Sequence, residues 1–145
     1  MTQALMTLDL YETTPEIPVI PHLYFHTETV EQKTKFLYRQ LLRAKRLKNR
    51  TLLLFYAFRL GELIEINTDT LLERALCIQH LSRYYQKVII RTFYIFESLG
   101  EEQIFRSQHV TLAMISRMSH AEYLNIIQVA TNLAGERLIS QEQDS

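Results

Sequence analysis

The chain is poor in residues that break or cross-link a backbone. Its 145 residues include three glycines, three prolines, one cysteine and no tryptophan. A β-rich fold, or a glycine loop that cradles phosphate, would need more turn residues than these. The single cysteine, Cys77, excludes an intrachain disulfide, which suits a reducing compartment. The shortage of helix breakers favours long helices, and the length fits one domain.

The chain also lacks a segment suited to spanning a membrane or directing secretion. The longest apolar run, LLLFYAF at residues 52–58, is far shorter than the roughly 20 residues needed to cross a bilayer. Residues 1–16 carry no basic flank before an apolar stretch, so they do not resemble a signal peptide. We expect a soluble, cytoplasmic protein.

A net charge of zero conceals one strongly basic segment. Residues 1–32 hold five acids and no lysine or arginine, whereas residues 33–50 hold eight bases and no acid. The eight bases, which are candidate contacts to nucleic acid or an acidic partner, are Lys33, Lys35, Arg39, Arg43, Lys45, Arg46, Lys48 and Arg50. Apolar residues alternate with them, which predicts an amphipathic helix suited to phosphate, an anionic membrane surface or an acidic protein. The alternative is a solvated face that pairs with the chain's own acidic residues 1–32.

Three regions follow from the residue pattern. Residues 1–28 are expected to form an extended arm, because Pro15, Pro18 and Pro21 recur with the three-residue period of polyproline II. Residues 29–138 are expected to form a helical domain, and residues 139–145 a disordered polar tail. The predicted fold class is all-α, a single-domain bundle of about five helices with the arm laid across it.

Capping signals and apolar spacing place the first helices. Thr29 and Gln32 match a T-x-x-Q capping box, which predicts a helix start at Thr29. Residues 51–66 are expected to form a helix that is apolar almost all round, with Gly61 allowing a neighbouring helix to approach closely. From residue 70, apolar residues recur every three or four positions, which predicts one unbroken helix over 70–99.

Residues 111–130 match part of the sequence pattern of a helix-turn-helix. The positions that agree with that pattern are Leu112, Ala113, Met118, Tyr123 and Ile126. Ser116 and Arg117 disagree with it. Ser119 and Glu122 form a capping box, which predicts that the second helix starts at residue 119 or 120. The alternative is that the apolar residues of this segment simply complete a helical core.

If this unit binds DNA, its second helix supplies the contacts to bases. The candidates are Ser119, His120, Asn125 and Gln128, since asparagine and glutamine suit adenine edges. Arg106 and Arg117 are candidates for phosphate contact only. Joint burial of Leu124, Ile126 and Ile127 would leave the helix no free face. Protrusion of this helix beside residues 33–50 would instead favour DNA binding.

Aromatic residues are dense in RYYQKVIIRTFYIF, residues 83–96, and surround that segment on most sides. A small bundle has difficulty burying so much apolar surface, which suggests a homodimer contact. The candidate interface residues are Tyr84, Tyr85, Val88, Phe93, Tyr94 and Phe96. The alternative is a central helix that the rest of the chain wraps.

No motif indicates catalysis. There is no G-x-S-x-G, no phosphate-binding glycine loop and no H-E-x-x-H. Cys77 and His80 share a helical spacing, but two ligands do not complete a metal site. We expect no metal, no cofactor and no enzymatic activity. The preferred interpretation is a non-catalytic regulatory or protein-interaction protein acting through helical surfaces. The alternative is a helix-turn-helix DNA-binding regulator that uses residues 111–130 for recognition and residues 33–50 for phosphate contact.

Overall fold

The computed structural model describes residues 29–106 and 109–143, and the predicted arm at residues 1–28 lies outside this part. The helices are α2 (Val30–Arg46), α3 (Arg50–Ile66), α4 (Leu71–Ile78), α5 (Arg83–Leu99), α6 (Gln103–Arg106), α7 (Leu112–Arg117) and α8 (His120–Gln143). The described residues contain no strand, so the all-α prediction is confirmed, with seven helices where about five were expected.

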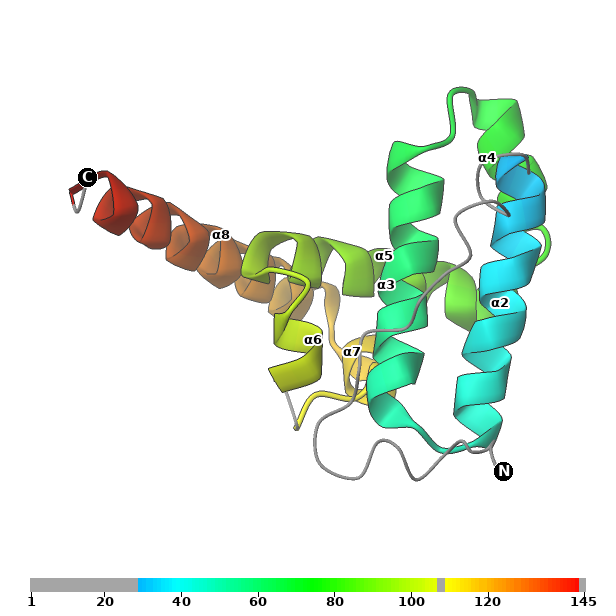
Figure 1. The fold of residues 1–145 in the computed structure, drawn as a ribbon, viewed down its shortest axis with the longest axis horizontal. Coiled ribbons are helices and arrows are strands. Elements are labelled where there is room, and N and C mark those ends of the chain that lie inside the picture. Colours follow the sequence, from blue (N-terminus) through cyan, green and yellow to red (C-terminus); the bar gives the residue numbers. More distant parts are fainter. Residues whose placement is uncertain (1–28, 107–108, 144–145) are drawn as a thin grey trace, which may run out of the picture.

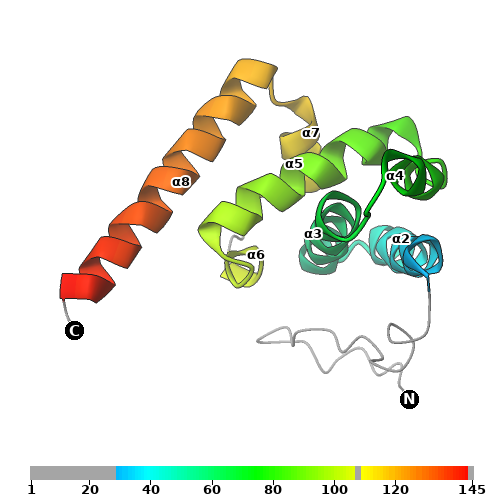
Figure 2. The same ribbon diagram turned by 90° about the horizontal axis from the view of Figure 1, so that it is seen from above.

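Helix α3 lies at the centre of the molecule. It runs antiparallel to α2 on one side, and α5 crosses it on the other (Figures 1 and 2). Phe55 and Ile64 of α3 and Ile89 of α5 are fully or almost fully buried in the core. A Cβ atom at Gly61 would lie 2.4 Å from the Ile89 carbonyl oxygen and 2.6 Å from the Phe93 Cβ. The predicted close approach at Gly61 is confirmed, and it brings the backbones of α3 and α5 together.

The prediction of one helix over residues 70–99 is wrong. Helix α4 ends at Ile78 and α5 begins at Arg83, so the chain turns between them (Figure 1). Ser82 caps α5 by accepting a hydrogen bond from the Tyr85 N–H. The Gln86 amide donates to the carbonyls of Ile78 and Leu81, which satisfies backbone groups that the break exposes.

Two predicted capping boxes are confirmed. Gln32 N–H donates to the Thr29 hydroxyl and Thr29 N–H donates to the Gln32 side chain. Glu122 N–H donates to the Ser119 hydroxyl and Ser119 N–H donates to the Glu122 carboxylate. Both boxes satisfy donors that a helix start leaves open, and they fix where α2 and α8 begin.

Helix α8 is longer than expected. It continues to Gln143 and so includes residues 139–143 of the segment that the sequence analysis assigned to a polar tail. Its first half packs against α5, with Ala130 buried and Tyr123 packed on the core. Its second half extends away from the other helices (Figures 1 and 2).

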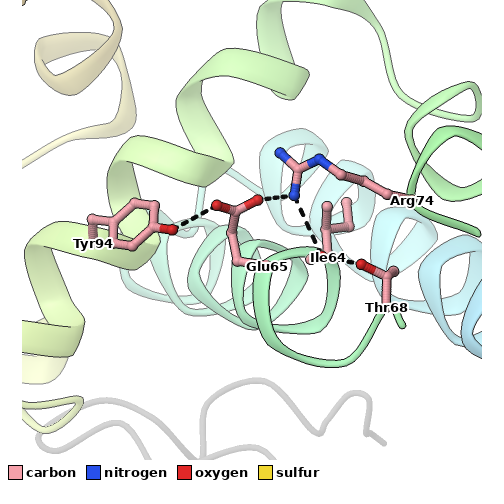
Figure 3. Close-up of polar contacts among 5 residues, drawn as sticks. All are labelled: Ile64, Glu65, Thr68, Arg74 and Tyr94. Carbon is pink, nitrogen blue, oxygen red and sulfur yellow. Dashed lines mark hydrogen bonds and ion pairs between the residues drawn. The ribbon is translucent and has the colours of Figure 1, made fainter. Parts of the chain in front are cut away.

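A polar cluster joins α3, α4 and α5 beside the core. The Glu65 carboxylate accepts a hydrogen bond of 2.6 Å from the Tyr94 hydroxyl and also pairs with the Arg74 guanidinium (Figure 3). Arg74 and Thr68 both donate to the Ile64 carbonyl. The hydrogen bond to Glu65 favours the neutral phenol and raises the pKa of Tyr94 to about 12.

Candidate functional site

Helix α2 has one buried face and one exposed face, with partly buried residues between them. The buried residues, which pack toward α3 and α4, are Thr34, Leu37, Leu41 and Ala44. Lys35, Arg39, Arg43 and Arg46 are all exposed, and their spacings of four, four and three place them on one face. These four side chains, here called the basic surface, extend over about 16 Å of helix.

The described acids that form ion pairs are engaged with other bases. Glu62 and Glu101 pair with Arg59, Glu65 pairs with Arg74, and Glu31 pairs with His80. In residues 29–106 and 109–143 no ion pair involves Arg39, Arg43 or Arg46 of the basic surface. These three arginines therefore carry positive charges that no acid of the described part pairs with. Pairing with residues 1–28 lies outside that part and stays a prediction.

A pocket of about 310 Å³ opens where α2 ends, and three more of the predicted bases line it. We call it the basic pocket. Its lining residues are Lys45, Lys48, Asn49, Arg50, Leu53, Tyr84, Tyr85, Thr111, Leu112 and Ala113. They come from the end of α2, the start of α3, the start of α5 and the start of α7. No acidic residue belongs to this lining.

Helices α7 and α8 follow one another in the chain, with only Met118 and Ser119 between them. A buried arginine of α5 holds this turn together. The Arg91 guanidinium donates to the carbonyls of Ile115, at 3.1 Å, and Met118, at 2.8 Å. It also lies over the ring of Tyr123 in α8. The sequence analysis did not single out Arg91, although a lone base among apolar residues in VIIRTFYIF, residues 88–96, was the available signal.

The polar candidates on α8 are exposed but partly engaged. Ser119 and His120 are exposed at its start, and Asn125 is exposed about one and a half turns later. The Gln128 amide donates to the Asn132 side chain at 3.0 Å, within the same helix face. The candidate phosphate contacts Arg106 and Arg117 are exposed as well.

Helix α8 is neither buried on all sides nor placed beside residues 33–50. Leu124 is 52% exposed, whereas Ile126 and Ile127 are partly buried against the core, so α8 keeps one free face. That face does not lie beside α2, because α3 and α5 stand between the two helices (Figures 1 and 2). The structure thus does not bring the basic residues of α2 next to α8.

The six candidate interface residues of α5 divide into two groups. Tyr85, Val88, Phe93 and Phe96 are buried within the single chain, where they pack in its core. Only Tyr84 and Tyr94 are exposed, by 45% and 36%. The alternative of a helix wrapped by the rest of the chain therefore accounts for the buried four, which have no surface to offer a second copy.

The apolar side chains with the largest exposed fractions lie outside α5. Leu71 and Leu72 of α4 are 86% and 71% exposed, and Ile66 at the end of α3 is 60% exposed. On α8, Val129 and Leu133 are exposed about one turn apart. Sequence reasoning missed the α4 surface, because it counted Leu71 in the apolar pattern of one helix over residues 70–99, and that helix is broken.

The histidine and cysteine candidates are occupied by contacts within the fold. Cys77 is buried, and burial raises the pKa of its thiol. His80 Nε2 lies 2.6 Å from a carboxylate oxygen of Glu31. Among the described residues no three histidine, cysteine or acidic side chains gather as metal ligands. In the same part of the chain, no helix combines the length and apolar character that a membrane span requires.

Comparison with protein-family models, with curated proteins and with solved structures found no match to the chain. Its function is therefore inferred from three features of its own structure: the basic surface of α2, the basic pocket, and the unit formed by α7 and α8.

Proposed function

We propose that this chain is a non-catalytic regulatory or assembly protein that binds an acidic protein partner through the basic surface of α2. The observation that carries the proposal is the row formed by Lys35, Arg39, Arg43 and Arg46, exposed on one helix face. Arg39, Arg43 and Arg46 form no ion pair with the described residues. Arginine matches carboxylates with a planar pair of donors, which suits an acidic helix or loop.

Stabilisation of α2 does not by itself explain this row of four basic residues. Bases in the last turn, Arg43 and Arg46, interact favourably with the negative end of the helix dipole. That benefit does not reach Lys35 and Arg39. Like charges four residues apart destabilise a helix by about 0.2–0.5 kcal/mol per pair, so the arrangement costs stability unless a partner neutralises it.

An acidic protein fits the surface better than a duplex does. The helix proposed to enter a DNA groove, α8, exposes Glu122 in its first turn and has no lysine or arginine from His120 to Leu133. Phosphate would repel Glu122. Exposed leucines such as Leu71 and Leu72 of α4 also suit a protein contact, since apolar side chains supply most of the buried core of such interfaces.

The test uses two polyanions of different chemistry with the full chain. Fluorescently labelled poly-L-glutamate and a mixed-sequence DNA duplex are titrated at low and physiological salt, and anisotropy is followed. We expect poly-L-glutamate to bind, with affinity that falls as salt rises. The double variant Arg39→Glu/Arg43→Glu should lose at least about tenfold in affinity. No binding at low salt would overturn the proposal.

A matched control carries the same change of charge elsewhere. Arg83 and Lys87 of α5 are also exposed and also four residues apart. The variant Arg83→Glu/Lys87→Glu should bind poly-L-glutamate within about twofold of the unchanged chain. If this control loses as much affinity as the α2 variant, binding follows net charge and not the basic surface.

The second candidate is a DNA-binding regulator, which the partial helix-turn-helix sequence pattern and the short connection between α7 and α8 favour. Arg106 and Arg117 would then contact phosphates. The same DNA titration tests it: a preference for duplex over poly-L-glutamate, lost in Arg117→Glu but kept in Arg39→Glu/Arg43→Glu, would replace the first proposal with this one.

A further inference from the structure

We propose that the basic pocket binds a small phosphate ester attached to a planar ring, the chemistry of a mononucleotide. The site is separate from the basic surface of α2, and the inference stands whether or not the proposed function is correct. It is carried by the lining of the pocket and by the backbone of Lys48.

The lining combines a cationic wall with an aromatic and apolar one. Lys45, Lys48 and Arg50 supply three positive charges, and no acid in the lining opposes them. Leu53 and Leu112 supply apolar surface. A volume of about 310 Å³ falls within the range of small-molecule sites, which begins near 300 Å³. A ligand with one anionic end and one apolar end therefore matches the two walls.

Two tyrosines define the aromatic wall. The rings of Tyr84 and Tyr85 meet edge to face, with centroids 5.0 Å apart and planes at 81°. Tyr85 is 5% exposed and is further held by Tyr38, whereas Tyr84 is 45% exposed. Tyr84 thus presents a ring whose neighbour is fixed, and a planar ligand ring can stack on it at low entropic cost.

Lys45 is already directed along this wall. Its Nζ lies 5.8 Å from the centroid of the Tyr85 ring. The contact keeps the ammonium at the aromatic wall without neutralising its charge. An anion that enters the pocket meets this charge on one side and those of Lys48 and Arg50 on the turn between α2 and α3.

Lys48 adopts a backbone conformation that glycine favours. Its φ is 56°, and it is the one described residue other than glycine with a positive φ. Helix α2 closes with Lys48 N–H bonded to the Lys45 carbonyl and Asn49 N–H bonded to the Ala44 carbonyl. This pair of bonds is the Schellman motif, whose left-handed position is usually glycine. A lysine there carries backbone strain, and this residue lines the pocket.

These features describe how the ligand would be held. A phosphate dianion lies against the three cations through charge-assisted hydrogen bonds from side chains, so no glycine loop is required. The attached ring lies on Tyr84. Inorganic phosphate satisfies only the cationic wall, and an unphosphorylated nucleoside satisfies only the aromatic one. Both should therefore bind more weakly than the ester.

Calorimetric titration of the full chain with adenosine monophosphate, adenosine and inorganic phosphate tests the inference. We expect adenosine monophosphate to bind at least about tenfold more tightly than either fragment. Tyr84→Leu should remove the advantage over inorganic phosphate. If adenosine monophosphate does not bind at millimolar concentration, or if it binds no better than phosphate, the inference is wrong.

Lys48→Gly separates a ligand role from a structural one. Glycine relieves the strain at φ 56°, so the midpoint of thermal unfolding should rise, while affinity for adenosine monophosphate falls about tenfold. Arg50→Gln is a second variant from the same wall, with the same expected loss. Arg39→Ala, on the basic surface, should leave the affinity unchanged. Equal affinity in Lys48→Gly, Arg50→Gln and the unchanged chain would overturn the inference.

Discussion

The guanidinium of Arg91 lies 4.9 Å from the centroid of the Tyr123 ring, so a residue of α5 stacks on a residue of α8. The same guanidinium donates to two carbonyls at the end of α7. Arg91 is only 7% exposed. One buried side chain of α5 therefore contacts the end of α7, the turn after it and the start of α8.

Arg91→Met should loosen the α7–α8 unit. The change removes two charge-assisted hydrogen bonds and the contact with Tyr123, and it leaves buried carbonyls without donors. We expect a loss of roughly 3 kcal/mol in the free energy of unfolding, measured with urea. Tyr123→Phe keeps the ring and should cost less than about 1 kcal/mol. An Arg91→Met variant as stable as the unchanged chain would show that α7 and α8 hold together without the arginine.

Gly61→Ala should destabilise the core although alanine favours helices. Its new Cβ would lie 2.4 Å from the Ile89 carbonyl oxygen, so α3 and α5 must separate. Overpacking of this kind costs about 1–3 kcal/mol, against a gain of about 1 kcal/mol in helix propensity. Gly135→Ala is the matched control, because a Cβ there meets nothing within 4 Å, and it should stabilise α8. Denaturant midpoints that move in the same direction for both variants would contradict the close approach at Gly61.

Tyr94→Phe should make the stability of the protein less dependent on pH in the alkaline range. The pKa of Tyr94 is raised from 10.0 to about 12 by its hydrogen bond to Glu65. A raised pKa in the folded state means that the stabilisation is complete below pH 10 and is lost as pH approaches 12. At neutral pH the variant should lose about 1 kcal/mol, a modest value because Tyr94 is 36% exposed. Thermal unfolding from pH 8 to pH 12 should show the two proteins converging, and a constant gap would refute the assignment.

Glu31→Gln should make the stability of the protein less dependent on pH in the acidic range. Its hydrogen bond to His80 lowers the pKa of Glu31 below the usual 4.5. A lowered pKa in the folded state means that the stabilisation is present above pH 4.5 and disappears as pH falls through the lower value. Urea unfolding from about pH 6 to about pH 3 should therefore show the unchanged chain losing its advantage over the variant. Glu97→Gln, which removes an exposed charge of α5, should show no such convergence.

Local signals in the sequence predicted the helix starts well. Thr29 with Gln32, and Ser119 with Glu122, are short-range patterns whose hydrogen bonds depend on residues three positions apart. Such contacts need no tertiary partner. Gly61 was also informative, because a glycine inside an apolar helix has few explanations other than close packing.

The break between α4 and α5 was missed because apolar spacing continued through it. Ser82 caps α5, but it is not followed by Glu or Gln at the third position, so it does not form a capping box. The basic pocket could not be predicted at all. It joins Lys48 to Thr111, and the packing of α7 against α5 and α3 brings these distant residues together.

Helix α8 is one continuous helix, but only its first half packs against the rest of the protein. Up to Ala130 it is fastened to α5, whereas residues 131–143 leave the body of the protein (Figure 2). A stretch of that length is marginal as a helix when water surrounds it, because nucleation is costly and short helices recover little of that cost. The anchored half serves as a preformed nucleus from which the remainder grows. A partner that binds along residues 131–143 therefore meets a helix that is already nucleated. Binding then costs less conformational entropy than folding an unstructured peptide would.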